Sequence, residues 1–515
     1  TILHDRRSRR IGGRVDFNRL EPSVIARAFP YLNQLADIRA PFSGNVNFEL
    51  AHGWQLLGLR LQLVSDFGQA TFAMAYPSGS EMVQVSARMN DIRLASLARA
   101  TPALSPLAGL DIPVSGVLEG GADPAGLFTL TKVDLTSGAG QVDLPGVFPQ
   151  TMKIAGARLS ADIDATTSTA MVRDFSVDFG GTKVSTSGRV RRDDAGYTMA
   201  VDAKVAELPM SDLAKYWPPG MGVSARQWVI SNIVDGTVNE GMVSLALNMP
   251  VENDRASVQV ESIDGTLQYQ GLSIKYWEPL PKVADVGGTA TFNAQGFKFA
   301  VSSGRLQDLA VEKASVDIIG LDAEDQAISI DAALRGSART LAQILDRKPL
   351  GYVSDIGISP AAISGEAVVR TKFDFPLITG LDAKSIRFSA SAGLGKLAVS
   401  PAPFGLTPRD GDVRLKVNNA GLSATGTMRL FASPATIDWR EDFRKDAKVR
   451  TNLVVSGRLP DLSRPGFGVP PTKMIKGPSD VNVVVTARSD GSTEILAGFE
   501  LVDAALDMKE VGWTK

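Results

Sequence analysis

The stretch 208–238, LPMSDLAKYWPPGMGVSARQWVISNIVDGTV, interrupts a chain that otherwise alternates apolar and polar residues. Its second half predicts a helix, because Ser224 opens the S-x-x-Q pattern of a capping box. Apolar pairs spaced i,i+4 continue that helix, and Gly236 predicts its end. A helix of about three turns is not stable alone in water. We therefore expect Trp228 and Ile233 to dock it onto a sheet.

On both sides of this stretch the apolar residues recur with a period of two, as in residues 199–205 and 243–249. Strict alternation places every second side chain on one face of a β-strand. On the order of twenty such strands follow one another, joined by short turns rich in Gly, Asn and Asp. The pattern predicts a mainly β, antiparallel sheet in which consecutive strands pair.

Helical spacing interrupts the strands at three other places. Residues 21–35 predict a kinked helix, 92–110 an irregular segment with two prolines, and 340–347 a short helix. No linker divides the chain. We therefore expect one continuous β architecture over residues 1–515, with helical insertions at 208–238 and 336–349.

Composition excludes several classes of function. Lys and Arg number 54 against 56 Asp and Glu, so no large basic surface for nucleic acid is expected. Cysteine is absent, which excludes disulfides and thiolate metal sites. Only His4 and His52 are present, and no nucleophile-elbow motif occurs. We expect no enzyme activity, no catalytic residue, no cofactor and no metal. We also expect the chain to be a fragment of a longer protein whose targeting segment is missing.

The apolar face of so large a sheet must contact something. A second sheet, a solenoid or barrels would close it with protein. A curved sheet could instead leave the face open as a groove filled by lipid. Periodicity alone leaves both possibilities open.

The residues predicted to line such a groove are the apolar members of the alternating strands. They are Leu59, Leu61, Leu63, Leu159, Ile163, Phe175, Val177, Phe179, Val201, Val205, Val243, Leu245, Leu247, Val258, Val260, Leu267, Ile274, Phe297, Phe299, Val316, Ile318, Ile328, Ile330, Leu334, Val413, Leu415, Val417, Val481, Val483 and Val485. Trp217, Trp228 and Ile233 are expected either to dock the central helices or to gate the groove.

Several short blocks, in order along the chain, carry a family resemblance. They are Pro209–Leu213, Tyr216–Pro218, Ala225–Val229, Asn232-Ile233, Asp235-Gly236, Pro349–Tyr352, Ser364–Glu366, Phe375–Leu377, Ile437–Trp439 with Glu441 and Phe443, Leu506-Asp507 and Gly512-Trp513. This ordered set resembles the AsmA-like, YhdP/TamB-type envelope proteins, and its central block resembles their DUF3971 segment.

The resemblance implies a long, twisted, curved β-sheet that forms an open, taco-like hydrophobic groove. It implies a bridge-like lipid transfer protein of the Gram-negative envelope, anchored in the inner membrane and crossing the periplasm, with a role in outer membrane biogenesis. Its partners would be phospholipids, the inner and outer membranes through segments missing here, and envelope proteins. The alternative is a scaffold or outer-membrane assembly factor that does not transport lipid and binds partners through its sheet edges.

Overall fold

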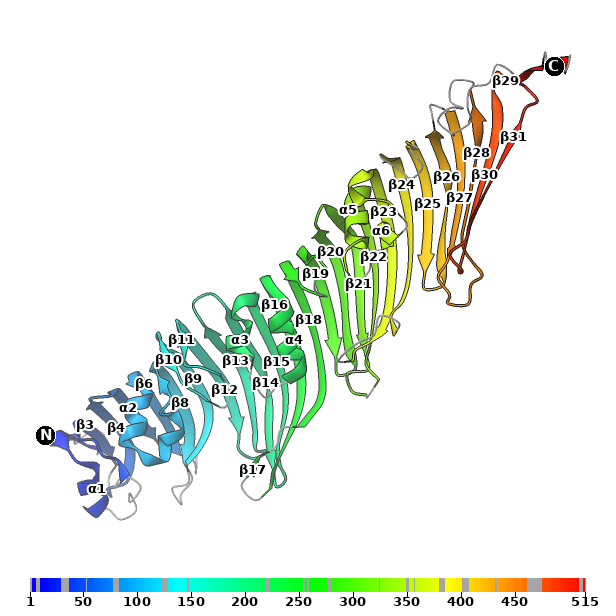
Figure 1. Ribbon diagram of the computed structural model, residues 1–515. Helices are drawn as coiled ribbons and strands as arrows, with labels where there is room; N and C mark the ends of the chain where they lie inside the picture. The colour runs from blue at the N-terminus through cyan, green and yellow to red at the C-terminus, as the bar shows by residue number, and fades with distance from the viewer. Residues whose placement is uncertain are drawn as a thin grey trace. The chain divides into compact units, whose positions relative to one another are not determined.

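The computed structural model describes most of the chain and is dominated by β-strands (Figure 1). The described residues are 2–514, except 6–9, 29–36, 52, 77–82, 123–127, 146–147, 218–222, 253–254, 257–258, 277–279, 324, 349–351, 356, 379–384, 401–406, 431–432, 461–474 and 509–512. Across these residues the main sheet has 27 strands. The predicted fold class, a mainly β antiparallel sheet with a few short helices, is confirmed.

The chain divides into two compact units. The first comprises Thr1–Ser231 and Thr237–Leu267, and the second comprises Asn232–Gly236 and Gln268–Lys515. Two strands, β16 (Ile233–Glu252) and β18 (Gln259–Ile274), contribute residues to both.

In the first unit each strand of the main sheet pairs antiparallel with the next in the following order. The strands are β1 (Ile2–Asp5), β2 (Arg10–Leu20), β3 (Phe42–Leu50), β4 (Leu56–Ser65), β5 (Gly68–Ala75), β6 (Val83–Arg93), β8 (Pro113–Ala122), β9 (Phe128–Ser137), β12 (Gly156–Asp164), β13 (Thr169–Asp178), β14 (Lys183–Asp193), β15 (Gly196–Pro209) and β16. The two-residue β17 (Arg255–Ala256) pairs with the end of β16.

The second unit repeats this arrangement, again with each strand paired to the next. Its strands are β19 (Val283–Asn293), β20 (Gly296–Leu306), β21 (Leu309–Ile319), β22 (Ala327–Ser337), β23 (Ile363–Pro376), β24 (Arg387–Val399), β25 (Arg409–Asn418), β26 (Gly421–Leu430), β27 (Ser433–Asp442), β28 (Val449–Leu459), β30 (Ser479–Arg488) and β31 (Thr493–Glu500). Among the described residues β31 pairs only with β30, so the sheet is open at this edge.

A recurring turn explains why consecutive strands form hairpins. The side chain of Asp193 accepts hydrogen bonds from the backbone N–H groups of Ala195 and of Gly196, the first residue of β15, at 3.0 and 3.2 Å. Asn293 does the same before β20, and Asn418 does so before β26. Asp and Asn are suited to this turn because the short side chain reaches the backbone two residues on.

Two small sheets accompany the main one. The first consists of β7 (Leu110–Asp111), β10 (Gly140–Val142) and β11 (Met152–Ile154), and the second of β29 (Ile475–Lys476), β32 (Ala505–Met508) and β33 (Trp513–Thr514). The first of these joins a buried cluster that includes Ile112 and Ile154.

The helices are short. They are α1 (Pro22–Ala28), α2 (Leu94–Ala100), η2 (Pro102–Leu107), η3 (Met210–Asp212), α3 (Leu213–Tyr216), α4 (Val223–Asn232), α5 (Ala338–Leu345), α6 (Tyr352–Asp355) and η4 (Pro360–Ala362). Helices were predicted in the regions of α1, α4 and α5, and the irregular segment 92–110 contains α2 and η2.

The predicted end of the central helix is wrong. The helix α4 ends at Asn232, and Ile233 already begins β16. Gly236 does have a positive φ of 95°, but it lies inside β16, where an added Cβ would meet the backbone of Gly271 at 2.6 Å. The glycine therefore permits a close backbone approach between strands instead of capping a helix. The side chain of Ser224 lies outside the described residues.

Candidate functional site

One side of the sheet in the second unit carries apolar side chains, and we call it the second apolar face. It is defined by Ile330 and Leu334 of β22 and the residues opposite them. Ile330 lies opposite Val316 of β21 and Phe373 of β23, and Phe373 lies opposite Phe388 of β24. Residues directly opposite in antiparallel strands point to the same side. One apolar row therefore crosses these four strands.

The register extends the second apolar face from β20 to β31. Every predicted lining residue of β20–β30 lies on it. These are Phe297, Phe299, Val316, Ile318, Ile328, Ile330, Leu334, Val413, Leu415, Val417, Val481, Val483 and Val485. Their predicted role as a lipid-binding lining stays a prediction.

The first unit has an equivalent surface, the first apolar face, defined by Val201 and Val205 of β15 and the residues opposite them. Val201 lies opposite Leu245 of β16. An added Cβ at Gly241 would meet Val205 Cγ1 and Leu267 Cδ2 at 2.9 and 3.0 Å, so Leu267 also lies on this side. The other predicted residues on this face are Leu59, Leu61, Leu63, Leu159, Ile163, Phe175, Val177, Val243 and Leu247.

Four predicted residues do not join these rows. Val260 is an odd number of positions from Leu267 on β18, which places it on the opposite side, and it is 56% exposed. Phe179 follows the end of β13 and contacts the Tyr216 ring, with a centroid distance of 5.1 Å. Ile274 lies beyond Gly271, whose positive φ interrupts the alternation. Val258 lies outside the described residues.

The helix α5 covers part of the second apolar face. Its Ala338 joins a buried cluster with Ala367, Val369 and Ala392, and Ala367 has no exposed surface. The Ser337 side chain caps the helix, accepting from the N–H groups at positions 339 and 340 at 3.1 and 3.5 Å. Under α5 the apolar face is therefore closed by protein.

The docking or gating role predicted for Trp217 and Trp228 stays a prediction. Trp228 of α4 is 52% exposed. Arg226 connects α4 to α3, donating from Nε to the Trp217 carbonyl and from Nη2 to the Ala214 carbonyl, both at 3.0 Å. These carbonyls lie at the C-terminal end of α3, where intrahelical donors are lacking. Ile233 belongs to β16, not to the helix.

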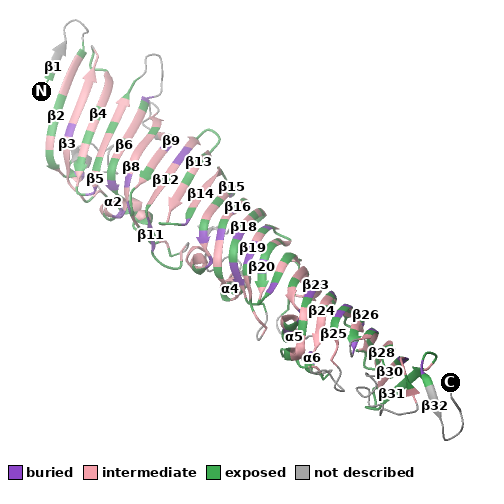
Figure 2. Ribbon diagram, turned by 90° about the horizontal axis from the view of Figure 1, so that it is seen from above, coloured by how far each residue is buried: buried purple, intermediate pink, exposed green. Residues whose placement is uncertain are grey.

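Elsewhere on both apolar faces large side chains stay accessible. Phe72 and Phe175 of the first unit are 38% and 44% exposed, and Ile495 and Phe499 of β31 are 53% and 37% exposed. Figure 2 shows intermediate burial along most strands of the first unit, with few fully buried residues. Contiguous exposed apolar surface on a protein indicates an interaction site.

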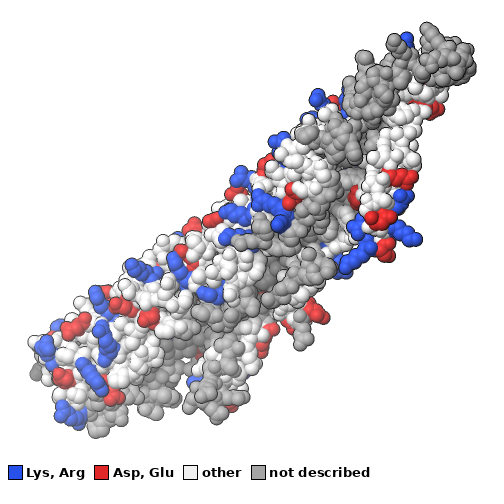
Figure 3. All heavy atoms as spheres, in the orientation of Figure 1, with Lys and Arg blue, Asp and Glu red and all other residues white. Residues whose placement is uncertain are grey.

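The opposite side of the sheet is polar. Ion pairs cross between neighbouring strands, for example from Arg335 to Glu312 at 2.6 Å and from Lys396 to Glu366 at 2.7 Å. Figure 3 shows side chains of both signs interspersed on the visible face, without a single-sign surface. Such exposed pairs stabilise little, but they keep this side in water.

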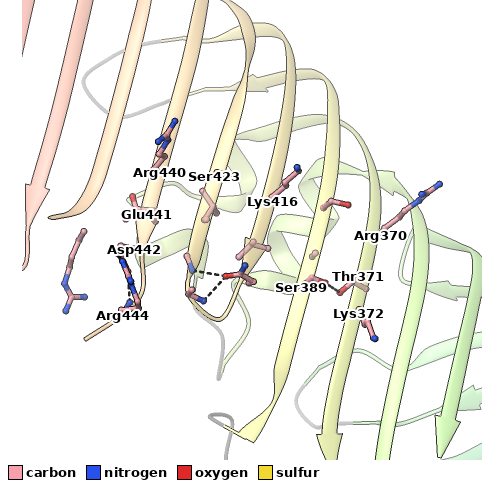
Figure 4. A pocket seen from close by; sticks show the side chains of 18 of the residues that line it. Arg370, Thr371, Lys372, Ser389, Lys416, Ser423, Arg440, Glu441, Asp442 and Arg444 are labelled. Atoms are coloured by element: carbon pink, nitrogen blue, oxygen red, sulfur yellow. Dashed lines mark hydrogen bonds and ion pairs between the residues drawn. The ribbon is translucent and has the colours of Figure 1, made fainter. Parts of the chain in front are cut away.

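A shallow hollow of the second unit is lined mostly by residues of the polar side, and its lining also includes Val417, Leu422 and Glu441 of the apolar face (Figure 4). Its lining includes one cross-strand row of Arg370, Ser391, Lys416, Ser423 and Arg440. The row is wide open and alternates cations with hydroxyls. It offers no enclosed site for a reactant.

The described residues contain neither a candidate metal cluster nor a membrane-spanning helix. No group of three or more His, Asp or Glu side chains among them is arranged to hold a metal ion. Nor is any helix in the described ranges long and apolar enough to cross a membrane. The feature that stands out chemically is the accessible apolar surface.

Comparison with known proteins identifies one family. Residues 116–507 match the family described as YhdP protein. No curated protein and no solved structure matches the chain. The matched range includes all of the central helical segment and the strands β9 to β31.

Proposed function

The chain belongs to the YhdP protein family, and from this premise we propose that it is a bridge-like lipid transfer protein. The proposed substrates are phospholipids, whose acyl chains the two apolar faces shield from water between the inner and outer membranes. The proposed location is the periplasm, with an inner-membrane anchor and membrane contacts supplied by other segments of the protein. Envelope proteins are the proposed partners.

One observation carries the proposal: apolar rows continue from strand to strand while several of their large side chains stay exposed. Each CH₂ group kept from water is worth about 0.8 kcal/mol. An acyl chain would gain this free energy at every position along such a row. It could therefore move along the row without passing through a much tighter binding position. Headgroups would stay in water at the strand ends, which avoids the cost of burying a charge.

The proposed mechanism is passive. No side chain has to react, so we propose that the protein is not an enzyme and needs no cofactor. The face solvates the lipid tail, and a gradient or a partner protein sets the direction of movement.

Lipid extraction and native mass spectrometry of the purified chain test the proposal. We expect copurifying phospholipid in stoichiometric amounts or more, since each unit has its own apolar face. A chain that stays free of lipid after incubation with phospholipid vesicles would contradict the proposal.

A second candidate, an envelope scaffold that binds partner strands, is favoured by the edge of the second unit. All eight residues of β31 are exposed, and among the described residues this strand pairs only on its β30 side. An open edge of this kind can accept another strand. Partner binding abolished by a proline in β31, in a chain that carries no lipid, would support this alternative.

A further inference from the structure

One charged residue lies on the second apolar face. The register assigns alternate positions of β22–β31 to this face, and among these described positions only Glu441 carries a charge. It lies opposite Leu422 of β26 and Thr451 of β28. Glu441 is the residue before the last of β27, so it marks the end of the apolar row.

Two neutral donors hold the carboxylate. Trp439 Nε1 donates to Oε1 at 2.7 Å, and Thr451 Oγ1 donates to Oε2 at 2.9 Å. Trp439 lies on the same face, opposite Leu453. All three polar side chains are half-buried.

Two nearby arginines pair with other carboxylates. Arg440 pairs with Asp438 and Arg444 pairs with Asp442, all on or beyond the polar side of β27. Within the described part of the chain no Lys or Arg forms an ion pair with Glu441. A carboxylate has about four acceptor positions, and the two observed bonds leave capacity for further donors.

A structural role for Glu441 would require only an acceptor for the indole, which a neutral glutamine also provides. The negative charge needs a separate reason, because a charge on an apolar surface is costly unless it is compensated. A carboxylate beside an indole is a combination that suits an ammonium group. The carboxylate accepts its N–H bonds, and the indole ring attracts the cation through its π face.

We propose that Trp439, Glu441 and Thr451 form a site for the ammonium group of an aminophospholipid. This inference rests on the proposed lipid transfer function and adds a headgroup preference to it. With its ammonium at Glu441, the lipid places its acyl chains on the adjoining apolar row of Leu453, Val485 and Ile495. A primary ammonium fits better than a quaternary one, because it has N–H donors to offer.

The test uses the full chain stripped of lipid and incubated with vesicles that contain equal amounts of phosphatidylethanolamine and phosphatidylglycerol with identical acyl chains. Native mass spectrometry then gives both the total lipid bound and the ratio of the two lipids. We expect a preference for phosphatidylethanolamine in the original chain. In Glu441→Gln the ratio should fall about tenfold, equivalent to about 1.4 kcal/mol, with total lipid unchanged.

Two variants sharpen the result. Trp439→Phe keeps an aromatic surface but loses the indole N–H and the stronger cation–π partner, so it should reduce the ratio less than Glu441→Gln. Glu366→Gln removes a carboxylate from the polar side of β23, where it pairs with Lys396, and should leave the ratio unchanged.

The outcomes separate this inference from the proposed function. Lipid binding without a headgroup preference, or with one that Glu441→Gln leaves intact, overturns the ammonium site while lipid transfer stands. An equal loss of both lipids in Glu441→Gln also overturns it, since that would indicate a purely structural role. A chain that binds neither lipid overturns the proposed function and the inference together.

Discussion

The second apolar face has the same alternating sequence beneath α5 as at β31, but these two regions differ in what covers them. Beneath α5, Val369 is 5% exposed, and on β31 Ile495 is 53% exposed. Both are aliphatic residues on one face of an antiparallel sheet. Two features differ: α5 follows the end of β22 and packs near Val369, whereas β31 is an edge strand that pairs only with β30 among the described residues. Alternation thus determines which side is apolar, and helical cover together with position in the sheet determines how accessible that side is.

The largest expected effect separates these two regions directly. Val369→Asp would bury a carboxylate between α5 and the sheet without a partner, and we expect it to destabilise the second unit by about 4 kcal/mol. Ile495→Asp places the same group in water and should cost about 1 kcal/mol or less. Thermal unfolding followed by circular dichroism measures both. If Val369→Asp and Ile495→Asp lower the unfolding temperature equally, β31 is also covered in solution.

The next prediction concerns the accessible part of the first apolar face. Leu245 is half-buried, so Leu245→Asp should leave the fold intact but reduce bound phospholipid about tenfold, because acyl chains avoid a charge. Ile330→Asp should act in the same way in the second unit. Asn248→Asp, on the polar side of the same strand as Leu245, is the matched control and should bind lipid normally. If Leu245→Asp unfolds the protein, the position belongs to a closed core.

A smaller effect is expected from weakening α5, the helix that covers part of the second apolar face. Ser337→Ala removes the N-cap of α5 and should destabilise the second unit by about 1 kcal/mol. Ser391→Ala, a surface serine of β24 outside any cap, should change the unfolding temperature very little. If Ser337→Ala leaves the stability of the second unit unchanged, α5 is held by its buried alanines alone.

The sequence predicted the strands well because their signal is local. Met199, Val201, Ala203 and Val205 lie on one face of β15 as the period of two requires. Nearly all predicted lining residues lie on the two apolar faces, because the alternation within each strand determines the side to which its residues point. The prediction that Val260 lies on the apolar face was wrong. Apolar and polar residues do not alternate clearly at the start of β18, where the first four positions are all exposed.

Features that depend on other strands were not predictable. Ile233 continued the helical spacing of α4, yet it begins β16, since β-branched residues suit a strand once a partner is present. In the sequence, Glu441 stands out only as part of the block Ile437–Trp439 with Glu441 and Phe443 that resembles the family. Its place on the apolar face depends on the register of β27 with β26 and β28, which a single sequence does not contain.

The smallest expected effect concerns Tyr269, a buried residue of β18. It is 7% exposed and meets the Phe299 ring edge to face, with a centroid distance of 6.4 Å. Burial raises the pKa of Tyr269 from 10.0 to about 12, because the phenolate is poorly solvated there. The neutral phenol therefore stabilises the fold fully below pH 10, and this contribution is lost as the pH rises from 10 towards 12.

Tyr269→Phe keeps the ring but cannot ionise, so it should remove that part of the decline in stability above pH 10. The measurement is the difference in unfolding temperature between the two proteins from pH 9 to pH 11, which cancels the titration of lysines common to both. Tyr197→Phe, at the start of β15, is the control. If the difference does not change with pH, the Tyr269 hydroxyl is solvated.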